Sequence, residues 1–458
     1  MPHVDGEPRL AYFDTYRQRA IMTMRHIRPV LLVQAAGLLI AGLITAPLAA
    51  QTTSEYDAQL STLMSHPAVR QALDLIESTD DETMADLRTL TEIPAPPFAE
   101  EERGRAFLAM LQDIGVDSAW IDEVGNVIGL RRGTGSGKVL ALAGHLDTVF
   151  PAGTDVSIRM QGDTLFAPGI ADDTRGLATV LAVLRAMNAA DVRTDADMLF
   201  IGNVGEEGLG DLRGMKHLFR EGGPQIDAFV SVDGTGSTGI THMGLGSHRY
   251  RVTFLGPGGH SWGAFGLANP AHALGRAIRY FQDGADPYTR SVEFRTNYNV
   301  GRIGGGTSVN SIPFESWMEI DMRSQGVETL EGVDAILQGA IRRAVAEENQ
   351  LRTRGEPLTV DVALIGDRPS GEISEDSEFV QRAAAATRAL GLQPTFGRSS
   401  TDSNIPISMG IPAITIGGGG DGFGAHSLGE GFRNVDGHIG IQRVMLSVLA
   451  QAGVARAS

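Results

Sequence analysis

A histidine and an aspartate separated by one residue follow a short apolar run in the first third of the chain. His145 and Asp147 stand directly after VLALAG, residues 139–144, which has the apolar pattern of a buried strand. A histidine that binds a metal ion uses one ring nitrogen, and a carboxylate commonly holds the other. The pair therefore indicates metal chemistry at a strand end, although this spacing alone is a weak signal.

Acidic residues recur further along the chain where strand-like runs end or helices begin. Each has an ordinary alternative explanation, because Asp and Glu also cap helices and favour their first turn. One aspartate would suffice for a cap, however, and the chain places two together before an apolar helix. Open α/β sheets place their sites where strands end in this way. The acids are Asp172, Asp173, Glu206, Glu207 and Asp233, and a late histidine, His426, lies in a glycine-rich loop.

These side chains suit a metal-dependent hydrolase. The chain has no cysteine, which excludes thiol catalysis and cysteine-ligated zinc. Imidazole and carboxylate ligands without thiolates fit zinc, manganese or cobalt in a hydrolytic centre. Two metal ions need about five protein ligands. Seven residues at the strand ends supply that number with two acids left over: His145, Asp147, Asp172, Glu206, Glu207, Asp233 and His426. One remaining acid could act as a general base and the other could orient a histidine.

The motifs GHLDTVFP, GIADDTRG, GEEG, SVDG and GAHS, with GGHSWG between the last two, resemble the M20 metallopeptidase family in order and approximate spacing. The resemblance covers nearly the whole chain after about residue 80. It implies two divalent metal ions, with Zn²⁺ as the first expectation and Mn²⁺ or Co²⁺ as alternatives. The implied ligands are His145, Asp172, Glu207, Asp233 and His426.

The resemblance also implies a role for each residue. Asp172 would bridge the two ions, with His145 and Asp233 on one of them. Glu207 and His426 would hold the other. The two remaining acids are Glu206, which would be the general base for the attacking water, and Asp147, which would support His145.

Three further residues are implied in an inserted domain. His260, in GGHSWG, matches a lid histidine that stabilises the developing oxyanion, often in the active site of the partner subunit. Asn310 and Arg323 fall where relatives carry substrate contacts, and a salt bridge at a sheet edge is the alternative for Arg323. The chain departs from several relatives at Thr174 and Arg175, where they have Lys-Gly.

Together the patterns and the resemblance predict an α/β fold. The expected catalytic domain has a mixed sheet with helices on both faces, of the dinuclear exopeptidase type, and carries an inserted α+β lid and dimerisation domain. The alternation of apolar and polar residues after Gly246 marks the start of this insertion. The expected parts are an N-terminal extension with signal peptide (1–50), the catalytic domain (51–245 and 366–458) and the insertion (246–365).

The N-terminal segment has the pattern of a secretory signal. Arg25 and Arg28 precede a long apolar run that ends in small residues, Ala49 and Ala50. We therefore expect an exported protein, periplasmic or secreted, without a stable membrane partner after cleavage. An uncleaved N-terminal membrane anchor is the alternative, because the run approaches the about 20 residues that span a bilayer.

The net charge of the chain and the family resemblance limit the classes of molecule that we expect it to bind. A formal net charge of −17 would repel a phosphate backbone, so nucleic acid is not an expected partner. The expected substrate is a small peptide, and the resemblance implies a homodimer through the lid domain.

An aspartate at position 233 is more typical of the aminopeptidase members, so we expect an aminopeptidase or a di- or tripeptidase. The alternatives are an N-acyl or N-carbamoyl amino acid amidohydrolase or carboxypeptidase, and a non-catalytic metal-binding scaffold, against which the Glu206–Glu207 pair argues.

Overall fold

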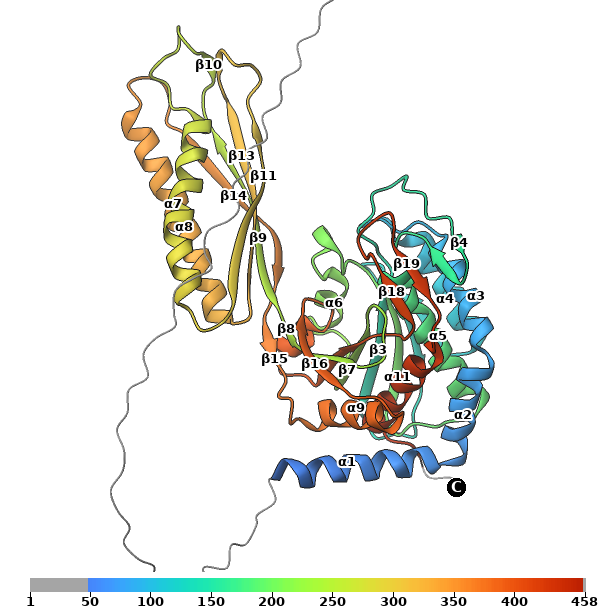
Figure 1. Cartoon of the computed structure of the whole chain (residues 1–458). Coiled ribbons are helices and arrows are strands. Elements are labelled where there is room, and N and C mark those ends of the chain that lie inside the picture. Colours follow the sequence, from blue (N-terminus) through green and yellow to red (C-terminus); the bar gives the residue numbers. More distant parts are fainter. Residues whose placement is uncertain (1–47, 456–458) are drawn as a thin grey trace, which may run out of the picture. The chain divides into compact units, whose positions relative to one another are not determined.

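The computed structural model describes residues 48–455 (Figure 1). Residues 1–47, which contain nearly all of the expected signal peptide, lie outside them. Among the helices of the described residues, none is both long and apolar enough to cross a membrane.

A large mixed sheet forms the centre of the fold. Its inner strands are mutually parallel: β3 pairs with β6 on one side and with β7 on the other, and β7 pairs with β17. Parallel strands place their carboxyl ends at one edge of the sheet. In spatial order the strands are β1 (Ser118–Ile121), β2 (Val127–Arg131), β6 (Asp197–Asn203), β3 (Val139–His145), β7 (Ala228–Val232), β17 (Ala413–Ile416), β8 (Gly239–Gly244) and β15 (Gly371–Glu372), with β16 (Thr395–Ser399) also paired to β8.

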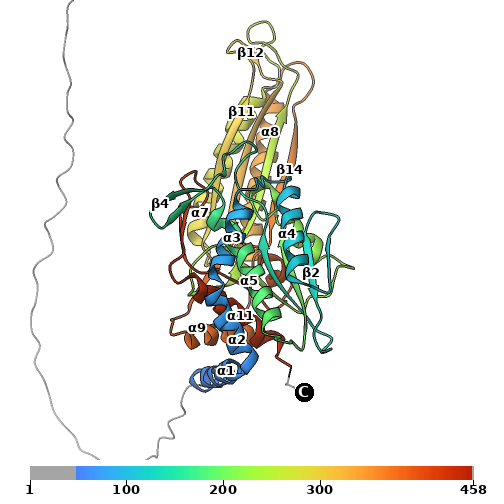
Figure 2. The same cartoon turned by 90° about the vertical axis from the view of Figure 1, so that its right-hand side faces the viewer.

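Helices cover both faces of this sheet, as predicted (Figures 1 and 2). Successive residues of β3 point to opposite faces, so Leu140 and Leu142 enter one core and Ala141 and Ala143 the other. The first core contains residues from α2 (Pro67–Ser78), α4 (Glu101–Ile114), α5 (Arg175–Ala189), α9 (Glu378–Ala389) and α11 (Gly437–Ala452). The second core contains residues from α6 (Arg213–Leu218) and α10 (Asn404–Ser408). Two further helices, α1 (Leu48–Ser65) and α3 (Asp80–Thr91), lie in the N-terminal part of the described chain.

A small antiparallel sheet joins distant parts of the chain beside the large one. Its middle pair links β5 to β19, with Gly431 opposite Phe166. The segment before α5 and the segment before α11 are therefore held together. The strands in order are β18 (Asp421–Phe423), β19 (Gly431–Arg433), β5 (Thr164–Phe166) and β4 (Arg159–Gln161).

The middle of the chain forms a separate sheet with two helices and a core of its own (Figure 1). In β13 buried and partly exposed residues alternate, and Met318, Ile320 and Met322 pack in a core with the two helices. β14 runs to Arg368, past the limit of 365 expected for the insertion, and the division into domains stays a prediction. The sheet order is β11 (Thr296–Gly305), β13 (Glu315–Ser324), β9 (Gly246–Leu255) and β14 (Thr359–Arg368), with α7 (Pro270–Ser291), α8 (Val327–Leu351) and the short pair β10 (Gly259–His260) and β12 (Ser311–Ile312).

Candidate metal centre

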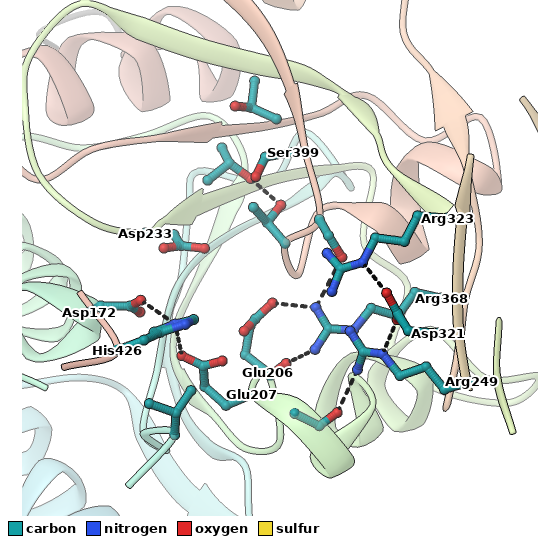
Figure 3. A pocket seen from close by; sticks show the side chains of 16 residues that line it. Asp172, Glu206, Glu207, Asp233, Arg249, Asp321, Arg323, Arg368, Ser399 and His426 are labelled. Carbon is teal, nitrogen blue, oxygen red and sulfur yellow. Dashed lines mark hydrogen bonds and ion pairs between the residues drawn. The ribbon is translucent and has the colours of Figure 1, made fainter. Parts of the chain in front are cut away.

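The residues predicted as metal ligands gather at the carboxyl edge of the large sheet. His145 is the last residue of β3 and Asp233 follows β7, whereas the other members lie in loops. Three groups have ligand atoms that all lie within 4.8 Å of one another, and Asp172 belongs to two of them. These two are Asp172, Glu207 and His426 (Figure 3), and His145, Asp172 and Asp233. The third group is His145, Glu206 and Glu207.

Asp172 lies between the two histidines. Its Oδ1 atom is 3.0 Å from Nε2 of His145, and its Oδ2 atom is 3.1 Å from Nε2 of His426. Nε2 of His426 is also 3.0 Å from Oε1 of Glu207. A carboxylate that offers one oxygen to each group has the arrangement of a ligand bridging two ions.

The ring of His145 is held by a backbone carbonyl group. Its Nδ1 atom lies 2.9 Å from the carbonyl oxygen of Asp147 and 3.8 Å from the carboxylate oxygen Oδ1 of the same residue. The carbonyl oxygen can only accept, so Nδ1 carries a proton and the opposite ring nitrogen, Nε2, faces Asp172. Asp147 does support His145, but through its main chain and not through the side chain that the sequence suggested.

The carboxylate of Asp147 binds the loop that follows β6. It accepts hydrogen bonds from the backbone N–H groups of Gly205 and Glu206, at 2.8 and 3.1 Å, and of Glu207, at 2.7 Å. A fully buried carboxylate needs such donors to offset its loss of hydration. Asp147 therefore positions the loop that presents Glu206 and Glu207.

The contacts of Asp173 explain why the chain has two adjacent aspartates, Asp172 and Asp173. Its carboxylate is fully buried and accepts hydrogen bonds from the backbone N–H groups of His145, Gly176 and Gly234, at 3.1 to 3.2 Å. Asp173 thus holds together the ends of β3 and β7 and the start of α5. The first aspartate of the pair faces the histidines and the second fixes the backbone.

Negative charge is concentrated at this edge. Burial raises the pKa of Asp233 to about 6 and that of Glu207 to about 7, and the charge of Asp172 adds to both shifts. Burial also works to raise the pKa of Asp172, but its hydrogen bonds with His145 and His426 outweigh this and lower it. Several buried carboxylates with few cationic neighbours fit a site for divalent cations, and the donor set suits zinc, manganese or cobalt.

Glu206 lies beside this cluster and is paired with an arginine that the sequence did not single out. Its Oε1 atom accepts a hydrogen bond from Nη1 of Arg368 at 2.9 Å, and both side chains are buried. A second N–H group of Arg368 donates to the backbone carbonyl of Glu206. Burial raises the pKa of Glu206 well above its ordinary value, and the charge of Arg368 opposes the shift.

Arginines line the other side of the same cavity, which has a volume of about 690 Å³. Asp321 accepts a hydrogen bond from Nε of Arg249 at 2.9 Å and another from Nε of Arg323 at 2.8 Å. In Figure 3 these side chains and Arg368 stand opposite the acid–histidine cluster, with Glu206 between the two groups. The structure thus brings Arg323 to the site.

His260 and Asn310 do not line this cavity in the described chain. Both are exposed and lie near each other, since His260 pairs with Ser311 and the backbone N–H of Ser261 donates to the carbonyl oxygen of Asn310. Nδ1 of His260 accepts from the backbone N–H groups of Trp262 and Gly263, both at 3.2 Å.

An open α/β sheet with a histidine–carboxylate cluster and a buried glutamate at its carboxyl edge defines the class of metal-dependent hydrolases. Residues 141–450 match peptidase family M20/M25/M40. The chain belongs to this family and is a hydrolase, as the sequence motifs predicted.

Three proteins illustrate the relationship. Carboxypeptidase G2 of Pseudomonas sp. (strain RS-16) is 27% identical over 312 residues, which cover 66% of this chain and 71% of the relative. The structure of aminopeptidase PepT from Bacillus cereus has a TM-score of 0.64 at 21% identity and covers 81% of this chain and 98% of its own. The YXEP protein of Bacillus subtilis, a dinuclear metal-binding peptidase of the M20 family, has a TM-score of 0.60 at 17% identity, with coverages of 82% and 99%. The likeness to these two structures establishes the shared fold.

Proposed function

We propose that this protein hydrolyses amide bonds of short peptides at a centre of two divalent metal ions, as an aminopeptidase or a di- or tripeptidase. The observation that carries the proposal is a single cavity that joins the acid–histidine cluster to Arg249 and Arg323. The cluster supplies a place for metal-assisted attack on a carbonyl group, and the arginines supply a place for an anionic group of the substrate. Zinc is the preferred metal, with manganese or cobalt as alternatives.

The metal assignment follows the two groups that contain Asp172. His145 and Asp233 would hold one ion, Glu207 and His426 the other, and Asp172 would lie between them. When bound, two such ions polarise the carbonyl group and lower the pKa of the attacking water.

Glu206 would handle the proton. Its carboxylate takes a proton from the attacking water as the new C–O bond forms, and returns it to the amine nitrogen as the C–N bond breaks. The hydrogen bond from Arg368 fixes one carboxylate oxygen and leaves the other available for this transfer. Burial of Glu206 favours proton uptake, because it raises the pKa of this residue.

The arginines favour a substrate with a free carboxylate near the scissile bond. Asp321 orients the guanidinium groups of Arg249 and Arg323 through their Nε atoms, and Nη1 of Arg249 also donates to the carbonyl oxygen of Gly208 at 2.9 Å. The remaining terminal N–H groups are available to a ligand in the cavity that both arginines line. Guanidinium groups bind carboxylates through paired hydrogen bonds. A di- or tripeptide carries its terminal carboxylate close enough to the scissile amide for this arrangement, whereas a long chain does not.

A carboxypeptidase or an N-acyl amino acid amidohydrolase is the second candidate. Its substrates also carry a carboxylate beside the scissile bond, and the similarity to carboxypeptidase G2 favours it. The requirement for a free α-amine separates the two candidates.

Assembly and location belong to the proposal as well. The family resemblance supports a homodimer through the lid domain, in which the partner subunit would supply a histidine at position 260. The exposure of His260, outside the cavity of its own chain, agrees with such a role. Export remains the expectation from the N-terminal pattern.

A peptide panel tests the proposed reaction. The metal-loaded protein would be incubated with a dipeptide, its N-acetylated form and its C-terminal amide, and the products would be identified by mass spectrometry. We expect hydrolysis of the free dipeptide and weak or no hydrolysis of both derivatives. Efficient cleavage of the N-acetylated form would favour the second candidate, and cleavage of none would reject both.

A further inference from the structure

Glu430 is a buried acid outside the acid–histidine cluster whose side chain binds the loop before α5. Its Oε2 atom accepts a hydrogen bond from the backbone N–H of Gly169 at 2.9 Å. Its Oε1 atom accepts from the backbone N–H groups of Ala171 and Asp172, at 2.8 and 3.0 Å. The side chain is therefore fully used in holding the backbone that presents the expected bridging ligand.

The same residue closes the loop that carries His426. The backbone N–H of Glu430 donates to the carbonyl oxygen of Ser427 at 3.1 Å, and that of Ser427 donates to Gly424 at 3.0 Å. His426 lies within the first of these turns, residues 424–427, with a φ of 66°. A residue other than glycine keeps this left-handed conformation only when its surroundings hold it. Glu430 thus touches one loop through its side chain and shapes the other through its main chain.

The contact requires a carboxylate. Its two oxygens accept hydrogen bonds from three backbone N–H groups, which are its direct partners. A glutamine would turn an N–H₂ group toward at least one backbone N–H group, and two donors cannot bond to each other. We therefore expect residues 169–172 to keep this conformation only when residue 430 carries a carboxylate.

We infer that Glu430 is a positioning residue that couples the placement of Asp172 to that of His426. It thereby sets the affinity for the metal ion that these two residues would hold with Glu207. This inference rests on the proposed function. The other ion depends less on Glu430, because His145 ends strand β3 and Asp233 follows strand β7 directly, so the large sheet positions both.

The test compares zinc binding by four full-length proteins, titrated against a competing chelator, with thermal unfolding as a check of folding. These are the wild type, Glu430→Gln, Glu430→Asp and the control Asp421→Asn. Asp421 lies on the neighbouring strand β18, where its half-exposed carboxylate pairs with Arg433 at 3.2 Å. Asp421→Asn matches the charge change, and the described hydrogen bonds and ion pairs of the Asp421 side chain do not include residues 167–172.

We expect two zinc equivalents for the wild type and for Asp421→Asn. In Glu430→Gln the site of Asp172, Glu207 and His426 should weaken by about 10- to 100-fold, the usual effect of removing a residue that supports a ligand, and the other site, which shares only Asp172, should weaken much less. kcat should fall more than KM changes. Glu430→Asp keeps the charge but is shorter by one methylene group, so the same site should weaken to a lesser degree, and this variant carries the test if Glu430→Gln fails to fold.

Wild-type affinity at both sites of a folded Glu430 variant would overturn the inference. Equal weakening of both sites would also overturn it, since Glu430 would then act on the fold as a whole. Fewer than two zinc equivalents in the wild type would instead contradict the proposed function.

Discussion

The carboxylate of Asp147 accepts a hydrogen bond from the backbone N–H of Glu207 at 2.7 Å, while its carbonyl oxygen lies 2.9 Å from the ring of His145. One residue therefore fixes the orientation of two expected ligands, one on each metal ion. Asp147 therefore connects the residues that follow β3 to the loop that follows β6.

Asp147→Asn should lower turnover and weaken the fold. The amide can accept hydrogen bonds with its oxygen only, so at least one N–H group of residues 205–207 loses its partner, at a cost of about 1–3 kcal/mol. The displaced loop carries Glu206 and Glu207, so kcat should fall more than metal content. Chemical denaturation, metal analysis and kinetics on one preparation would measure this, and a metal-free but stable variant would contradict it.

Glu206→Gln should retain both metal ions and lose about 10²- to 10⁴-fold in kcat, because the amide cannot accept the proton of the attacking water. The amide oxygen can still accept the hydrogen bond from Arg368, so the local structure should persist. Glu207→Gln is the contrasting variant and should lose metal from one site. A metal-replete Glu206→Gln protein with near wild-type kcat would exclude Glu206 as the general base.

Arg323→Ala should raise KM for a free dipeptide by about 10- to 100-fold, since a charge-assisted hydrogen bond contributes about 1.5–3 kcal/mol. The C-terminal amide, already a poor substrate, should be affected much less. Arg302→Ala is the matched control, because Arg302 lies on the same sheet, is largely exposed and pairs with Glu319. Equal effects of the two substitutions, or equal effects on the two substrates, would argue against carboxylate binding by Arg323.

The stability of the metal-free protein should fall as the pH rises from about 4 to about 9. The hydrogen bond to Asp172 raises the pKa of His426 from 6.5 to about 9, and this stabilisation is complete below pH 6.5 and lost through pH 9. Burial raises the pKa of Asp233 from 3.8 to about 6 and that of Glu207 from 4.5 to about 7. These acids also bind protons more tightly in the folded state, so they destabilise it as the pH passes through those ranges.

Metal ions replace these protons, so the difference in Tm between metal-loaded and chelator-treated protein should widen with pH. Thermal unfolding of both forms between pH 5 and pH 9 would measure it. A difference that stays constant or narrows would mean that these groups do not bind the metal.

Sequence patterns were sufficient for the parts of the site that follow from strand order. His145 and Asp233 come at or directly after the ends of parallel strands, and such strands share one edge. Glu206 and Glu207 follow the end of β6 at the same edge, and Asp172 lies just before α5, so their proximity could also be anticipated.

Contacts between distant segments could not be predicted in this way. Glu206 and Arg368 are 162 positions apart, and Asp172 and Glu430 are 258 positions apart, with no local pattern that marks either partner. The pairing of Asp321 with Arg249 depends on the register of β13 against β9. The direction of the Asp147 carboxylate depends on which N–H groups the loop after β6 presents.

A zinc titration of chelator-treated protein, with the hydrolysis of a free dipeptide followed at each step, tests the central claim most directly. The proposed centre predicts no turnover without metal and a rate that reaches its maximum at two zinc equivalents per chain. Wild-type turnover after complete removal of metal would contradict it.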